Sequence, residues 1–305
     1  QGNSYDYALI GQASITDKKV SLNESIEKGL EFLSKISGDY MIIDGQDSTS
    51  LIGTYDVFKE SNALLLLKNS LLKDRNLYKN PTVSGRYYWK DGNYKVDDFD
   101  DYSEKIVLSG TNWPGIHWAA ISRNIQWLDY SISKQYDVSA MYQYPSTGPN
   151  FEYNIRLDTH YDKFRKASID TINNLKYNVA KLINGTRVSK EEYYSRLANS
   201  KIILAPFGYG EMAPRDIEAA YLGAILIKPN MNYIDTVPNI FKENETYIAC
   251  EHDFSDLEEK IESIIGNYKN YHYIIENARN KFKEVMDPHC IATHLYNLFK
   301  NLKGV

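Results

Sequence analysis

The sequence has little that could cross-link it, anchor it in a membrane or bind a polyanion. Its 305 residues include only two cysteines, Cys250 and Cys290, which cannot build a disulfide framework and lack metal-site spacing. No apolar run approaches the roughly 20 residues of a membrane-spanning helix. The net charge of -5 gives no attraction to nucleic acid or to an anionic membrane. We therefore expect a protein of a reducing, cytoplasmic compartment without nucleic acid as a partner.

The composition is that of an ordinary globular protein, with 43% hydrophobic and 25% charged residues. A length of 305 residues favours two domains over one. The chain begins Gln1-Gly2-Asn3-Ser4 without a methionine, so we expect either a start trimmed for expression or a piece of a larger polypeptide. Further domains, and any association with a membrane, would then belong to parts outside this sequence.

The second half alternates short apolar runs with amphipathic helical patterns. Strands are expected at 136–142, 177–182, 201–206, 224–228 and 247–250. Helices are expected at 161–175, at 214–223 and along the C-terminal tail. Two more helices are expected to begin at capping boxes, one formed by Ser189 and Glu192 and the other by Ser255 and Glu258. Strands alternating with helices of this length predict right-handed crossovers and a parallel sheet covered on both faces.

The first half is less regular. Strands are expected at 7–10, 40–43 and 105–108, with a helix opened by the capping box Ser21 and Glu24. The apolar run 63–72 fits either a helix or a strand. The acidic stretch 97–101 is expected to be a solvated loop. These patterns predict a smaller α/β domain that ends near residue 130.

The loop 206–214, between two expected core strands, carries unusual polar chemistry. In doubly wound domains, ligands bind beyond the carboxyl ends of such strands. Gly208 and Gly210 allow the backbone to approach a ligand, and Pro214 suits the first position of a helix. The helix N-terminus and Arg215 favour an anion such as a pyrophosphate. Glu218, nearly one turn further on, could accept hydrogen bonds from a ribose diol.

A structural interpretation of the same residues stays open. Glu211, Arg215 and Glu218 could simply form ion pairs on the surface of a helix. Gly-x-Gly is a weak signal by itself, and Ala213 stands where a dinucleotide fingerprint has its third glycine.

The string SKIILAPFGYGEMAPRDIEAAYLGAILIKP, continued by TYIACEHDFSDLEEKIESII, resembles the C-terminal domain of GT-B glycosyltransferases of the group-1 and exostosin-like branches. The resemblance covers about residues 136–299. The matching positions are Arg215, Glu218, Ala219, Gly223 and Pro229.

One position departs from that family's pattern. Many group-1 enzymes have two glutamates framing seven residues, and Glu218 matches the second. The first position is Gly210 here, and Glu211 lies one residue away, so the first glutamate's contact with the donor sugar does not transfer to this chain.

The resemblance implies two Rossmann-like domains facing across a cleft. Residues 1–130 would form the acceptor side, 131–287 the nucleotide-sugar-binding domain, and 288–305 a helix that returns toward the first domain. The implied reaction moves a sugar from a nucleotide-diphosphate or CMP donor to a glycan or other hydroxyl acceptor. No metal is expected, and the only cofactor-like group is the donor substrate itself. The expected donor-binding residues are Gly208, Tyr209, Gly210, Glu211, Arg215, Asp216, Glu218 and Lys228.

The catalytic base of an inverting enzyme would come from the first domain. Asp47 follows the expected strand 40–43, and His117 follows the strand 105–108; each also fits a structural role. The sequence Asp98-Phe99-Asp100 spells the metal motif of GT-A enzymes, but it lies in the acidic stretch. Two other functions stay open: a nucleotide-sugar 2-epimerase of the same fold, and a non-catalytic module that binds sugar nucleotides or glycans.

Overall fold

The computed structural model describes residues 7–109, 128–146, 148–182, 186–237, 239–286 and 288–302. These residues form two compact units, which are described separately. The first unit comprises the described residues of Gln1–Trp113 together with Pro149–Leu157 and Tyr233–Val237. The second unit comprises the described residues of Pro114–Gly148, Asp158–Asn232 and Pro238–Val305. The sequence predicted one crossing near residue 130, whereas the chain also returns twice to the first unit.

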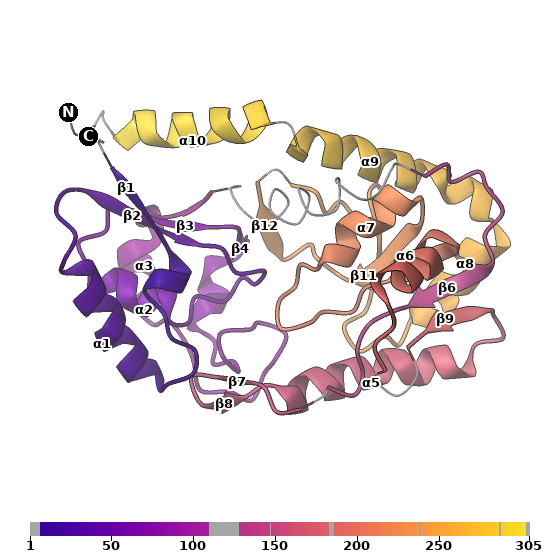
Figure 1. Ribbon diagram of the computed structural model, residues 1–305, viewed down its shortest axis with the longest axis horizontal. Helices are drawn as coiled ribbons and strands as arrows, with labels where there is room; N and C mark the ends of the chain where they lie inside the picture. The colour runs from indigo at the N-terminus through magenta and orange to yellow at the C-terminus, as the bar shows by residue number, and fades with distance from the viewer. Residues whose placement is uncertain are drawn as a thin grey trace. The chain divides into compact units, whose positions relative to one another are not determined.

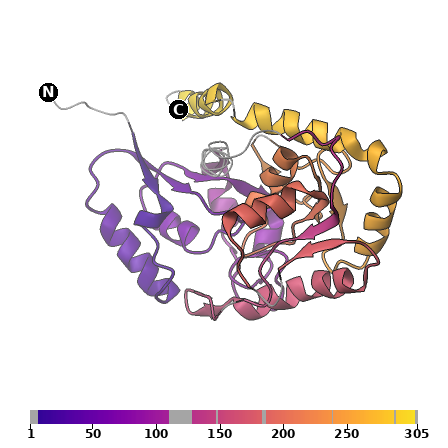
Figure 2. The same ribbon diagram turned by 45° about the vertical axis from the view of Figure 1, so that its right-hand side comes forward.

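The first unit is built on a four-stranded parallel sheet in the order β1-β2-β3-β5 (Figure 1). Its strands are β1 (Ala8–Gly11), β2 (Tyr40–Asp44), β3 (Leu66–Lys68) and β5 (Ile106–Leu108). Helix α1 (Leu22–Leu33) packs beside α2 (Thr54–Lys59), as Figures 1 and 2 show. Ser21 caps α1 as predicted, since its Oγ accepts a 3.3 Å hydrogen bond from the backbone N–H of Glu24.

In the first unit, the structure decides between the two expectations for 63–72 and contradicts the one for 97–101. The run 63–72 forms two strands, because after β3 the chain enters β4 (Ser70–Leu72), which pairs antiparallel with β12 (Ile234–Thr236). The expectation of a solvated acidic loop is wrong: α3 (Phe99–Tyr102) occupies that stretch and buries Phe99. The Asp98 carboxylate accepts a 2.8 Å hydrogen bond from the Tyr55 hydroxyl.

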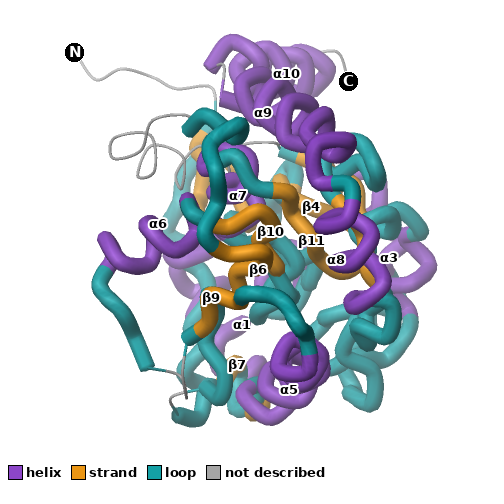
Figure 3. Tube along the Cα trace, turned by 90° about the vertical axis from the view of Figure 1, so that its right-hand side faces the viewer, coloured by secondary structure: helices purple, strands orange, loops and turns teal. Residues whose placement is uncertain are grey.

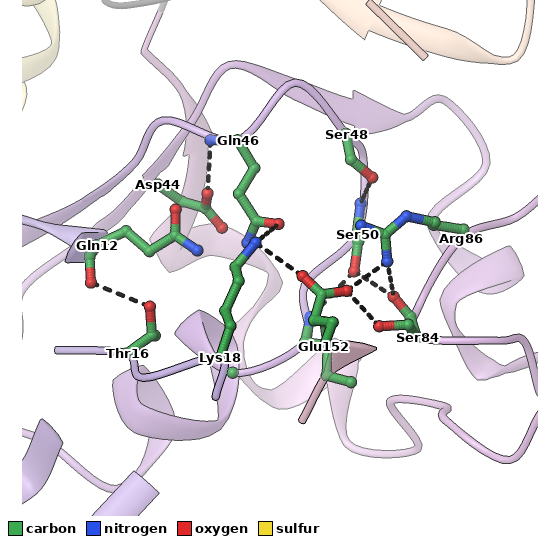
Figure 4. Close-up of polar contacts among 12 residues, drawn as sticks. Gln12, Thr16, Lys18, Asp44, Gln46, Ser48, Ser50, Ser84, Arg86 and Glu152 are labelled. Atoms are coloured by element: carbon green, nitrogen blue, oxygen red, sulfur yellow. Dashed lines mark hydrogen bonds and ion pairs between the residues drawn. The ribbon is translucent and has the colours of Figure 1, made fainter. Parts of the chain in front are cut away.

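A buried glutamate holds one returning segment against the first unit (Figure 4). Glu152 lies in β7 (Phe151–Glu152), which pairs with β8 (Ile155–Arg156), and only 3% of its surface is exposed. Its carboxylate lies 2.6 Å from Arg86 Nη1 and 2.7 Å from Lys18 Nζ, and it also accepts from the Ser84 hydroxyl. Burial by itself would raise the pKa of Glu152, but Arg86 and Lys18 more than offset it and lower the pKa to about 2.

This cluster predicts a specific pH dependence of stability. A carboxyl group whose pKa falls from 4.5 to about 2 on folding stabilises the protein above pH 4.5, and that contribution is lost as the pH falls toward 2. Wild type should therefore lose about 2 kcal/mol from this group between about pH 7 and pH 3. Glu152→Gln should lack this component, so its stability deficit should shrink in acid. Urea unfolding across this range measures it, with the exposed Glu27→Gln as control; an unchanged pH profile in Glu152→Gln would contradict the assignment.

The second unit contains a five-stranded parallel sheet in the order β13-β11-β10-β6-β9 (Figure 3). Its strands are β6 (Tyr136–Ala140), β9 (Val179–Lys181), β10 (Ser200–Leu204), β11 (Ile225–Pro229) and β13 (Ile248–Cys250). This parallel order confirms the Rossmann-like prediction. The carboxyl ends of β10 and β6, at the centre of the sheet, place the following loops at one edge.

Helices pack in two groups against this sheet (Figure 3). Helix α5 (Asp158–Asn174) packs beside α8 (Leu257–Gly266). Helix α6 (Lys190–Ala198) packs beside α7 (Pro214–Leu222), which also packs beside α9 (His272–Met286). The final helix is α10 (Pro288–Leu302). Its return toward the first unit stays a prediction.

Of the two capping boxes predicted here, only the first cap forms. Ser189 Oγ accepts from the Glu192 N–H at 3.1 Å, whereas α8 begins after Asp256 without a side-chain cap. Asp256 instead accepts from the backbone N–H of Glu251, because the turn before α8 places its carboxylate there. Among the residues that the structure describes, no helix combines the length and apolar character needed to span a membrane.

Candidate functional site

The predicted anion-binding loop joins β10 to α7 and packs closely over an arginine. Gly208 and Tyr209 are half-buried, and the Gly208 N–H donates to the Gly210 carbonyl at 3.1 Å. A Cβ atom on Gly208 would lie 3.3 Å from Nη2 of Arg165, so glycine keeps the backbone close to that guanidinium. The Tyr209 ring stacks on Tyr161 with ring centroids 4.9 Å apart.

A fully buried ion pair fixes the start of α7. Lys228 Nζ lies 2.6 Å from Asp216 Oδ2 and donates to the Glu211 carbonyl at 2.9 Å. The same Asp216 oxygen accepts from the Ala213 N–H at 2.9 Å. Burial raises the pKa of Asp216 and lowers the pKa of Lys228, while their attraction opposes both shifts. Three of the predicted site residues are thus buried: Glu211 within the loop, Asp216 in α7 and Lys228 in β11.

Two arginines meet at the loop, and one of them was not predicted. Arg165 of α5 is 4% exposed and donates from Nε to the Phe207 carbonyl at 3.1 Å and from Nη1 to the Gln143 carbonyl at 3.0 Å. The Tyr142 ring centroid lies 5.2 Å from the Arg165 guanidinium carbon and 5.9 Å from that of Arg215. Neither arginine forms an ion pair with a carboxylate within the described part of the chain.

This arrangement concentrates positive charge under the loop. Burial, followed by repulsion from Arg215, lowers the pKa of Arg165 to about 10. A buried guanidinium without a carboxylate partner is unfavourable by itself, and an anion bound beside it would relieve both the burial and the repulsion. The sequence signal for Arg165 is its spacing, since buried Tyr161, Ser168 and Ile172 lie on the same face of α5.

Glu218 lies nearly one turn beyond Arg215 and faces two tyrosines of α6. Its Oε2 accepts from the Tyr193 hydroxyl at 2.8 Å, and its Oε1 accepts from the Tyr194 hydroxyl at 3.3 Å. Arg215 interacts electrostatically with both Tyr193 and Glu218, and these two groups oppose the effect of burial and raise the pKa of Arg215. Burial raises the pKa of Glu218, although these hydrogen bonds and Arg215 oppose the rise. The structure therefore brings together Arg165, Arg215 and Glu218 at one edge of the second sheet.

The two candidate bases belong to other parts of the chain. Asp47 follows β2 in the first unit and is half-buried; burial raises its pKa, and Arg86 and Lys18 oppose the rise. His117 lies outside the described residues. Of the metal motif, Asp98 pairs with Lys59 and Asp100 pairs with Lys79.

Comparison with solved structures establishes the fold. Sucrose-phosphate synthase from Thermosynechococcus elongatus matches with a TM-score of 0.52 at 12% identity, over 98% of this chain and 74% of that chain. Anabaena HepE in complex with UDP and glucose matches with a TM-score of 0.43 at 11% identity, over 97% and 71% of the two chains. A glycosyltransferase from Rickettsia africae ESF-5 matches with a TM-score of 0.43 at 12% identity, over 92% and 81%.

No family model matches the chain, and no curated protein matches its sequence. The likeness to sucrose-phosphate synthase, at 12% identity, defines the fold. The protein has the α/β fold of GT-B glycosyltransferases, with one parallel sheet in each of its two units.

Proposed function

We propose that the protein is a glycosyltransferase that moves a sugar from a nucleoside-diphosphate donor to a hydroxyl group of a glycan or other acceptor. The observation that supports the proposal is the pair Arg165 and Arg215, which share the Tyr142 ring and form no direct ion pair with a carboxylate in the described chain. Two adjacent guanidinium groups at the start of α7 suit a diphosphate better than the single phosphate of a CMP-linked donor.

Each part of the donor nucleotide is assigned to particular residues of the second unit. The arginines would hold the diphosphate, and the Glu218 carboxylate would accept hydrogen bonds from the ribose diol. Lys228 and Asp216 would keep the loop and the helix start in position, since both side chains are buried. HepE has been solved with UDP and glucose, which makes UDP the first nucleotide to test.

In the proposed reaction, the acceptor oxygen attacks the anomeric carbon, and the bond from that carbon to the diphosphate breaks. The hydroxyl proton passes to a base, for which Asp47 and His117 are the candidates. Arg165 and Arg215 would stabilise the negative charge that develops on the leaving diphosphate. Because cationic side chains take this role, we propose that transfer does not require a divalent metal.

The deciding experiment combines binding with turnover. Thermal shifts with UDP, GDP, CMP, ADP and TDP identify the nucleotide, because a ligand of the native state raises stability. The matching sugar nucleotide is then incubated in EDTA with and without candidate acceptors. Acceptor-dependent release of nucleoside diphosphate supports the proposal. A new sugar nucleotide formed from the donor alone indicates the epimerase, binding without turnover indicates a binding module, and no nucleotide binding overturns the assignment.

Glu218→Gln tests the ribose contact. The substitution keeps the size of the side chain but replaces one acceptor oxygen by an NH2 group, so we expect affinity for the ribonucleotide to fall about three- to tenfold. The loss should vanish for the 2′,3′-dideoxy nucleotide, which has no hydroxyl to donate. Titration calorimetry measures both ligands, with the exposed Glu191→Gln of α6 as the control. An equal loss for both nucleotides would make Glu218 a structural residue.

A further inference from the structure

Two consecutive tyrosines converge on one carboxylate in the second unit. Neighbouring side chains on a helix normally point in directions about 100° apart, yet the hydroxyl groups of Tyr193 and Tyr194 both donate to Glu218. Their rings meet edge to face, with centroids 5.2 Å apart. Glu218 is only 3% exposed, so the tyrosines cover a carboxylate that the proposed function needs for a ligand.

The two contacts differ in strength. The Tyr193 hydroxyl lies 2.8 Å from Oε2 and also interacts electrostatically with Arg215, so it lies between the guanidinium and the carboxylate in the same network. The Tyr194 hydroxyl lies 3.3 Å from Oε1 and has no second hydrogen-bond partner among the described residues. The longer contact and the missing second partner make Tyr194 the easier of the two to move.

A ribose diol that binds Glu218 in a bidentate manner needs an accessible lone pair on each carboxylate oxygen. Both oxygens already accept from tyrosine, and burial of Glu218 leaves little open surface for further donors. The weaker donor must then leave Oε1 when the diol arrives, whereas the stronger donor can stay beside Oε2.

We propose that Tyr194 takes the place of a ribose hydroxyl on Glu218 until nucleotide binds and displaces it, while Tyr193 stays and couples the ribose contact to Arg215. The proposal rests on the proposed function, because in that function Glu218 binds the ribose of the nucleotide. It makes the two tyrosines determinants of ribose recognition. A ribose with its 2′,3′-diol can donate to Glu218 in place of the Tyr194 hydroxyl. A dideoxyribose has no hydroxyl that could take this place.

The proposal predicts opposite effects for two adjacent, chemically identical substitutions. Tyr194→Phe removes the competing hydroxyl, so the ribonucleotide no longer has to break a hydrogen bond to a charged acceptor and should bind about three- to tenfold more tightly. Tyr193→Phe removes the link between Glu218 and Arg215, so the same ligand should bind about three- to tenfold more weakly. The dideoxy nucleotide leaves Tyr194 in place, and its affinity should not change in Tyr194→Phe.

Titration calorimetry on the full chain tests these signs. Wild type is titrated with UDP, GDP and ADP, and the tightest ligand is carried forward with its 2′,3′-dideoxy analogue. Tyr177→Phe is the matched control, since Tyr177 is a half-buried tyrosine of the same unit that packs at the edge of its core without contacting Glu218. Thermal midpoints of all variants show whether a change in affinity reflects folding.

Carbon-13 labelling of the tyrosine Cζ atoms gives a second measurement. The Tyr194 signal, assigned by its absence in Tyr194→Phe, should shift on saturation with nucleotide as its hydroxyl leaves the carboxylate. Two results would overturn the displacement of Tyr194 by ribose. One is unchanged or weaker ribonucleotide binding in Tyr194→Phe, and the other is a Tyr194 signal that does not move. Neither result would contradict nucleotide binding itself. If none of the three nucleotides binds to wild type, the proposed function itself fails, and the tyrosine pair is a structural contact.

Discussion

Lys228→Met is expected to lower the free energy of unfolding of the second unit by about 3–5 kcal/mol. Lys228 and Asp216 are both fully buried, and their charged atoms lie 2.6 Å apart. Methionine fills similar volume but leaves the Asp216 carboxylate buried without its cation, which is the costly way to break such a pair. Because the same lysine also binds the Glu211 carbonyl, the variant should also weaken nucleotide binding.

The pH dependence of Lys228→Met follows from the remaining carboxylate. Burial already raises the pKa of Asp216 above 3.8, and removal of the lysine removes the main opposing attraction. The folded variant then holds its proton more tightly than the unfolded chain, so its stability should fall as pH rises above about 4. Urea unfolding at several pH values, with peptide-level hydrogen exchange to identify the unit, measures this effect.

Two further variants sharpen that experiment. Adding Asp216→Asn should restore part of the lost stability, because the amide carries no buried charge. Lys68→Met breaks an equally buried pair with Asp44, at 2.9 Å, in the first unit. It should destabilise that unit without changing nucleotide affinity. Retention of wild-type stability by Lys228→Met at neutral pH would contradict the assigned role of the pair.

Arg165→Gln is expected to weaken nucleoside-diphosphate binding by about 10- to 100-fold, since a charge-assisted hydrogen bond to phosphate is worth roughly 1.5–3 kcal/mol. Glutamine can still donate to one of the carbonyl groups that Arg165 contacts, but it brings no charge to the loop. Arg165→Lys should lose less affinity, because the charge remains and only the planar geometry is lost. Calorimetric titration with the nucleoside diphosphate and with its monophosphate locates the effect on the phosphate groups.

A double-mutant cycle connects the two arginines. Arg215→Ala should weaken nucleotide binding by a similar factor, and the two losses should not add if both groups hold the same diphosphate. Arg196→Gln is the control, because Arg196 lies in the same unit and pairs with Glu192 on α6. If Arg165→Gln binds nucleotide as tightly as wild type does, the positive charge of Arg165 has a structural role. The arginine pair would then no longer support the proposed function.

The sequence was most informative where the structural signal is local. The strands on either side of 206–214 are continuous apolar runs, and the Ser189 cap and Pro214 mark helix starts through bonds within a few residues. The alternation of these elements was enough to predict the parallel sheet of the second unit and the loop at its edge. The expected solvated stretch 97–101 failed because its acidic residues concealed the buried Phe99.

Only the tertiary structure decided which side chains meet. Gln143 and Phe207 follow β6 and β10, whereas Arg165 lies in α5 and Arg215 in α7. The strand order β10-β6 brings these segments to one edge of the sheet. The sequence by itself predicted the fold class and the loop, since periodicity and helix caps depend on neighbours in the chain, and it singled out Arg215 and Glu218 as candidate binding residues. The inward arginine, the buried lysine and the tyrosines on Glu218 depend on packing between segments far apart in sequence, which local patterns do not encode.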